Sequence, residues 1–171
     1  MRIKPSLELF LALDAAYGVV DDEKLSRLAP TVKARGHLSR ADLEEVCRWK
    51  SARALPLIRR NTENEVQEVT RLALATESER LRIETLVLLQ GVGWPMASVI
   101  LHWFHEEAYP LMDVRALWSL GISVPTEYSF SFWWKYVETC RSLSSTLGVS
   151  MRTVDRALWQ YSKKNGGPGT P

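Results

Sequence analysis

The sequence predicts an all-α fold, a single compact domain of about nine or ten short helices containing a helix-hairpin-helix. Apolar residues recur at spacings of three and four along most of the 171-residue chain, and no stretch sustains an alternation of period two. Apolar residues make up 46% of the chain, which is enough for a core, and no repeat or long linker divides it. We therefore expect one domain over residues 1–164, followed by a flexible Gly- and Pro-containing tail over residues 165–171.

The first elements follow from their apolar faces and caps. One apolar face covers residues 9–20 and ends at Val20, and Asp21-Asp22 then opens a helix near residues 23–36. We expect Pro30 to disturb this second helix. Ser39 is a good N-cap for a third helix to residue 50, because Asp42 stands at its N3 position. Apolar periodicity predicts further helices over 61–75, 83–87, 97–104, 132–147 and 154–161.

Residues 88–101, LLQGVGWPMASVIL, interrupt one apolar run and at once begin another. Gly91 suits the left-handed conformation that ends a helix, and Gly93 allows a second tight bend. Trp94 and Pro95 then open the next helix, where proline is tolerated. Such a hairpin exposes backbone N–H groups at a helix start, which favours phosphate binding, although a hairpin turn that binds nothing has the same pattern.

An aspartate follows the hairpin helix at a fixed distance. Asp113 lies twenty residues after Gly93 and directly precedes VRALWSL, so it can serve as a helix N-cap. With these residues the chain resembles the helix-hairpin-helix DNA glycosylase superfamily over about residues 86–120. The matching positions are Leu88, Gly91, Val92, Gly93, Ala97, Pro110 and Asp113.

The resemblance implies a function for each part. The backbone N–H groups of residues Gly91, Val92, Gly93 and Trp94, together with a bound cation, would grip a phosphate of double-stranded DNA. Asp113 would stand at the mouth of a cleft that receives a flipped nucleotide and would stabilise the sugar cation or activate water. Strand-cutting members carry a Schiff-base lysine where this chain has Pro95, which implies a monofunctional enzyme, if the chain is active at all. Tyr109, Arg115 and Trp118 are candidates to line the pocket.

A basic stretch provides candidate phosphate contacts. Residues 48–60 contain no acidic residue, and Trp49 lies among the basic ones. An aromatic residue among cations is typical of a nucleic-acid contact strip, whereas a solvated helix face neutralised by Glu63, Glu65 and Glu68 is the alternative. The basic residues of the strip are Arg48, Lys50, Arg53, Arg59 and Arg60.

Two alternatives to an enzyme remain open. The first is a non-catalytic DNA-binding protein on the same fold. The second is a transcription regulator, because residues 141–159 resemble a helix-turn-helix whose second helix would present Arg152 and Arg156 to the major groove.

The composition of the chain limits the cofactors that it can bind and indicates a cellular compartment. Two cysteines, Cys47 and Cys140, cannot supply an iron–sulfur cluster, and His102 and His105 have no identifiable third metal ligand. We therefore expect no metal or other cofactor beyond a monovalent cation at the hairpin. Reduced thiols favour the cytoplasm, the net charge of +2 neither demands nor excludes nucleic acid, and no signal peptide or membrane span is predicted. No obligate protein partner is evident.

Overall fold

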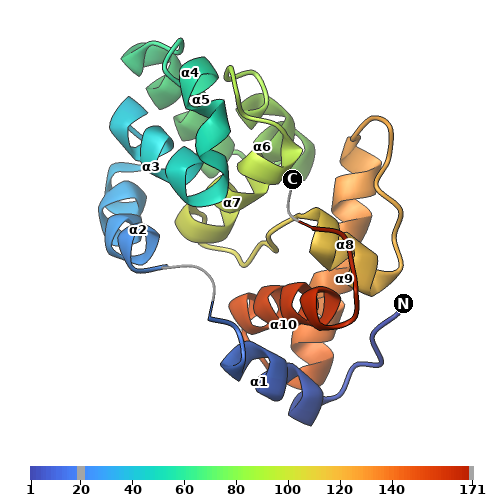
Figure 1. The fold of residues 1–171 in the computed structure, drawn as a ribbon. Coiled ribbons are helices and arrows are strands. Elements are labelled where there is room, and N and C mark those ends of the chain that lie inside the picture. Colours follow the sequence, from blue (N-terminus) through green and yellow to red (C-terminus); the bar gives the residue numbers. More distant parts are fainter. Residues whose placement is uncertain (19–21, 170–171) are drawn as a thin grey trace. The chain divides into compact units, whose positions relative to one another are not determined.

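The computed structural model describes residues 1–18 and 22–169, and every regular element in these ranges is helical. The prediction of an all-α fold is therefore confirmed for this part of the chain (Figure 1). The predicted face position Val20 and the predicted helix-opening residue Asp21 lie outside the described residues. None of the described helices is both long and apolar enough to cross a membrane.

Contacts between the elements group the chain into two compact units. The first unit contains α1 and α8 to α10, and the second contains α2 to α7. That residues 1–164 form one domain ahead of a flexible tail stays a prediction.

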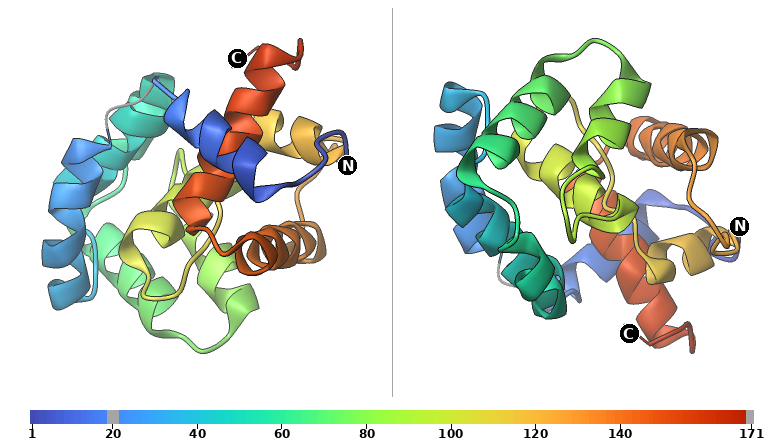
Figure 2. Two further views of the ribbon diagram at one scale, coloured as in Figure 1. Left: turned by 90° about the horizontal axis from the view of Figure 1, so that it is seen from below. Right: turned by 90° about the horizontal axis from the view of Figure 1, so that it is seen from above.

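The first unit is built around its last helix, α10. Met151, Val154, Ala157 and Leu158 of α10 are all buried. Helices α1 and α8 pack on α10 most extensively, and Figure 2 shows α1 lying against it. The helices of this unit are α1 (Leu7–Ala15), α8 (Val114–Leu120), α9 (Phe130–Leu147) and α10 (Met151–Lys164).

The second unit is built around α7. Seven of the eleven residues of α7 are buried, and α2, α3 and α6 pack against this helix. The helices of this unit are α2 (Glu23–Arg35), α3 (Arg40–Ser51), the 3-10 helix η1 (Ala52–Ala54), α4 (Leu55–Ile58), α5 (Glu63–Ala75), α6 (Glu79–Leu86) and α7 (Trp94–Phe104).

Local sequence signals account for most helix ends. Ser39 caps α3 and forms the predicted capping box with Asp42. Asp113 caps α8, as predicted, because its side chain accepts a hydrogen bond from the Ala116 N–H. Pro30 does not interrupt α2, contrary to the prediction. The missing N–H of Pro30 frees the Ser26 carbonyl, and water can satisfy this carbonyl because Ser26 is exposed.

Candidate functional site

The turn between α6 and α7 forms the predicted hairpin, and its two glycines have different roles. Gly91 has φ +81°, the left-handed conformation that glycine adopts without strain. It lies four residues beyond the C-cap of α6, Val87, so it shapes the turn instead of ending the helix. Gly93 is the N-cap of α7 with φ −91° and ψ 175°, extended backbone that any residue adopts. The predicted second glycine bend is therefore wrong.

The surroundings of the two glycines also differ. A Cβ added to Gly91 would lie 3.0 Å from the Leu57 Cβ and 3.1 Å from the Ile58 backbone nitrogen, so α4 packs tightly on the turn. A Cβ added to Gly93 would meet only the Pro95 Cδ, at 3.8 Å. Gly93 is exposed, whereas the Val92 side chain is 4% exposed and packs inward. Only the second glycine therefore leaves its backbone open to an approaching ligand.

The start of α7 provides the donors that an anion requires. Gly93 makes no side-chain cap, Trp94 and Pro95 occupy the first two helical positions, and Pro95 has no N–H. The early N–H groups of a helix have no carbonyl partner within the helix, and the helix dipole adds partial positive charge there. Of the two leucines before the turn, Leu89 is 3% exposed and packs inward, whereas Leu88, the predicted motif position, is 74% exposed.

A buried amide that the sequence analysis missed holds the turn in place. Asn61 is 4% exposed, its Nδ2 donates to the Ile58 and Gln90 carbonyls at 2.9 Å each, and its Oδ1 accepts from the Gln90 N–H at 2.8 Å. Asn61 therefore joins the hairpin to the end of the basic stretch, one residue after Arg60. Its position directly before the N-cap Thr62 gives no sequence signal for this long-range contact.

The structure divides the predicted basic strip into two groups. Arg48 bonds Glu44 and Glu45 at 2.7 and 2.6 Å, and Arg59 lies 3.3 Å from Glu44. By contrast, Arg53 and Arg60 are exposed, and no carboxylate among the described residues pairs with either of them. Lys50 is half-buried, and Trp49 packs edge-on against Trp103. For Arg48 and Arg59 the neutralising acids are Glu44 and Glu45 of α3, whereas the prediction named Glu63, Glu65 and Glu68.

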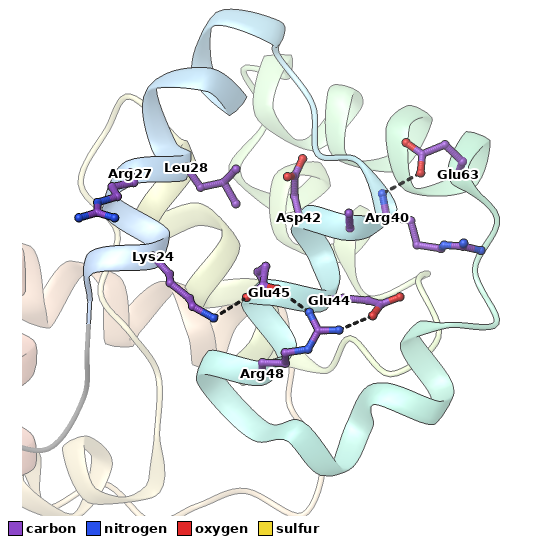
Figure 3. Close-up of a pocket in the computed structure, with 10 residues that line it drawn as sticks. Lys24, Arg27, Leu28, Arg40, Asp42, Glu44, Glu45, Arg48 and Glu63 are labelled. Carbon is purple, nitrogen blue, oxygen red and sulfur yellow. Dashed lines mark hydrogen bonds and ion pairs between the residues drawn. The ribbon is translucent and has the colours of Figure 1, made fainter.

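A hollow of about 570 Å³ lies beside α2 and α3, and several of its charged side chains already bond one another (Figure 3). Lys24 lies 3.6 Å from Glu45, and Arg48 bonds Glu44 and Glu45. A ligand would have to break these pairs, so we do not place the functional site there. Within the described residues, no group of three or more metal-binding side chains gathers.

Asp113 lies in the first unit at the start of α8. Its Oδ1 accepts the Ala116 N–H at 2.8 Å, and its side chain is half-buried. Tyr128 lies close enough that burial and then the Asp113 charge raise the pKa of the phenol. The carboxylate therefore has a fixed orientation beside a half-buried aromatic residue, which the sequence analysis did not single out.

The three predicted pocket residues have other partners in this unit. Tyr109 is fully buried and stacks on Trp133 with ring centroids 5.8 Å apart. The Arg115 guanidinium lies over the Trp159 ring at 4.9 Å, and the Arg2 guanidinium lies over Trp118 at 4.7 Å. Trp118 and Arg115 are half-buried, so they keep some accessible surface, whereas Tyr109 has none.

The predicted recognition helix of a regulator also has internal partners. Arg152 and Arg156 each lie over the Tyr17 ring at 5.5 Å, and Arg156 reaches Asp14 at 3.3 Å. Helix α10 thus uses these side chains to pack against the end of α1, which gives no support to a major-groove role.

Comparisons with known proteins give one similarity. No family model and no curated protein matches the chain. A solved structure, the 8-oxoguanine glycosylase/lyase of Methanocaldococcus jannaschii in complex with a 15mer DNA containing 8-oxoguanine, aligns over 93% of this chain and 80% of its own. The identity is 19% and the TM-score is 0.49. At these values the similarity by itself assigns neither a family nor an activity to this chain.

Proposed function

We propose that this chain binds double-stranded DNA through the α6–α7 hairpin and excises a base from it as a monofunctional glycosylase-like enzyme. The observation that supports DNA binding is the hairpin itself. Gly93 is exposed at the uncapped start of α7, and Gly91 and Asn61 fix the turn against α4. Backbone N–H groups at a rigid helix start bind phosphate without large side-chain rearrangement.

Two cations support the same role. Arg60 directly precedes the residue that clamps the hairpin, and Arg53 lies in η1, ahead of α4. Because neither pairs with a carboxylate among the described residues, both can neutralise phosphates at no cost in internal ion pairs. Arg48 and Arg59 would first have to leave Glu44 and Glu45.

Asp113 supplies the chemistry in this proposal. Excision needs the target nucleotide outside the stack and negative charge near the sugar, which becomes cationic as the base departs. The Ala116 N–H holds the Asp113 carboxylate in one orientation, so the charge is preorganised. Pro95, which has no amine, stands where a Schiff-base lysine would be required, so the product is an intact abasic strand.

A second candidate function is DNA binding without catalysis. The observation that favours it is the same hydrogen bond, because capping α8 is by itself a sufficient structural role for Asp113. Both functions share the hairpin and differ only in what the carboxylate does.

The test incubates the protein with duplexes that each carry one damaged or mismatched base and then cuts abasic sites with alkali. We expect Asp113→Asn to retain DNA binding, because asparagine still accepts the Ala116 N–H, and to lower the excision rate by about 100- to 1,000-fold. Asp14→Asn is the matched control, since it removes a half-buried carboxylate of the same unit that pairs with Arg156.

Three results would contradict the proposal. If no substrate is processed and Asp113→Asn lowers only the melting temperature, the aspartate is a cap and the non-catalytic function replaces the enzyme. If borohydride traps a covalent protein–DNA adduct, another amine acts as the nucleophile and the monofunctional assignment is wrong. If the protein does not bind duplex DNA, both candidate functions fail.

A further inference from the structure

The segment that leads to Asp113 is unusual because it is irregular and completely buried. Residues 109–112 form no regular element, yet all four are buried, with Tyr109 and Met112 at 0% exposure. A buried backbone outside a helix must find its hydrogen-bond partners elsewhere, because water cannot reach it. The partners of this segment therefore show what holds it in place.

Two side chains bond the backbone of one residue in this segment, Leu111. The Leu111 N–H donates to the Asp155 Oδ1 at 3.0 Å, and the Leu111 carbonyl accepts from the Tyr136 hydroxyl at 2.7 Å. Asp155 belongs to α10 and Tyr136 to α9. Two helices of the first unit thus hold the two peptide groups on either side of the Leu111 Cα.

Burying either side chain costs free energy unless its polar atoms are hydrogen-bonded. Asp155 is 4% exposed and Tyr136 is 1% exposed. Moving a carboxylate and a phenol out of water is unfavourable unless hydrogen bonds replace the lost hydration. Burial raises the pKa of Tyr136 well above its ordinary value, so the phenol keeps the proton that it donates to Leu111.

The next residues transmit the position of Leu111 to the carboxylate. Met112 is fully buried, and Asp113 follows directly as the N-cap of α8. Only one peptide unit beyond Leu111 therefore separates the held backbone from the reacting side chain. Because the intervening residue is buried, a displacement of the Leu111 backbone should also displace Asp113.

We propose that Asp155 and Tyr136 are positioning residues that fix the place of the Asp113 carboxylate through Leu111. The inference rests on the proposed function for its catalytic meaning. Its geometric content, that the two side chains hold the Asp113 cap in place, is independent of any reaction.

The test compares two disruptive variants with a matched control. Tyr136→Phe removes one hydroxyl donor, and Asp155→Ala removes the acceptor, while Asp155→Asn keeps an oxygen that can accept the Leu111 N–H. Ser119→Ala is the control, because the Ser119 hydroxyl is also buried and donates to a backbone carbonyl, that of Leu158, at 2.6 Å.

Two readouts are measured on the full-length protein. The first is kcat and KM for excision, for which we expect Tyr136→Phe and Asp155→Ala to lower kcat by about tenfold or more at unchanged KM, since small misplacements of a catalytic group are costly. The second is hydrogen exchange of the Ala116 amide, which reports whether the Asp113 cap is in place. We expect about tenfold faster exchange in both variants, recovery in Asp155→Asn, and no change in Ser119→Ala.

The outcomes separate the two proposals. If the unmodified protein excises nothing, the proposed function fails, and Ala116 exchange alone decides the positioning inference. If the protein is active but the disruptive variants change kcat and Ala116 exchange no more than Ser119→Ala does, the positioning inference fails while the proposed function stands. If Asp155→Ala does not fold, Tyr136→Phe, which only removes one oxygen, decides the result.

Discussion

Alanine substitution should destabilise the protein at Gly91 and leave its stability nearly unchanged at Gly93. Gly91 combines φ +81° with contacts of 3.0 and 3.1 Å to an added Cβ. The left-handed conformation costs a non-glycine residue about 1–2 kcal/mol, and forcing an extra methyl group into packed surroundings adds about 1–3 kcal/mol. At Gly93 the backbone is extended and the nearest atom is 3.8 Å away, so neither cost arises.

For Gly91→Ala these costs sum to about 2–4 kcal/mol, allowing for some relaxation of α4. In a chain of this length each kcal/mol lowers the melting temperature by about 2–4 °C, so we expect a decrease of about 5–15 °C. Gly93→Ala should stay within about 0.5 kcal/mol of the parent protein. Thermal unfolding followed by circular dichroism at 222 nm measures both.

Gly93 should instead matter for DNA. Replacing Gly93 by valine places a branched side chain at the exposed start of α7, where the proposed phosphate must approach the backbone. We expect duplex affinity to fall by at least about tenfold, equivalent to about 1.4 kcal/mol, with an unchanged melting temperature. Equal affinity for Gly93→Val and the parent protein, at equal stability, would refute the hairpin contact. Equal stability of Gly91→Ala and Gly93→Ala would refute the packing argument.

Three further perturbations test other parts of the molecule. Neutralising Arg53 and Arg60 together should lower the slope of log affinity against log salt concentration by about two. Neutralising Arg48 and Arg59 should change this slope less, because Glu44 and Glu45 already pair with them. Equal slopes for the two double variants would contradict this division. Asn61→Ala should lower both the free energy of unfolding, by about 1–3 kcal/mol, and DNA affinity, since the N–H and the carbonyl of Gln90 both lose the Asn61 amide as their partner. Unfolding and binding titrations that match those of the parent protein would contradict the role of Asn61 as a clamp. Burial, followed by repulsion from Arg82, lowers the pKa of His105, so the folded state favours the neutral imidazole. The stability that follows from this preference is complete above the unfolded pKa of about 6.5, and it is lost as pH falls from there toward the folded pKa. Relative to His105→Gln, the parent protein should thus lose stability between pH 7 and pH 5 in urea titrations, and parallel pH profiles would contradict the expected burial effect.

The sequence was sufficient wherever the physical signal was local. Ser39 with Asp42, and Asp113 before α8, are caps that depend on residues three positions apart, and both have the predicted geometry. The prediction for Pro30 was wrong because the cost of a proline depends on whether water reaches the freed carbonyl, which periodicity alone does not reveal. Gly93 was misjudged because a glycine in sequence does not specify its own φ.

The contacts that hold the candidate sites could not be predicted, because they join residues distant in sequence. Asn61 meets Gln90 across 29 positions, and Asp155 meets Leu111 across 44. Each is an ordinary polar residue on an otherwise amphipathic stretch, so its composition and spacing carry no signal. Which basic residues of the strip pair with an acid could not be predicted either, since Arg59 and Glu44 lie 15 residues apart in sequence.

Because Asn61 clamps the hairpin, the turn cannot be transplanted onto another protein scaffold by itself. A peptide of residues 86–104 contains both glycines and all of α7, but it leaves out the amide that bonds Gln90 and the α4 surface on which Gly91 rests. Such a fragment would lose the scaffold that fixes its turn and would sample many loop shapes. The smallest transplantable unit therefore starts before α4, near residue 52, and carries α5 and α6 along with the turn. Protein engineers who graft this element onto another scaffold would need to move about fifty residues to preserve a turn of seven.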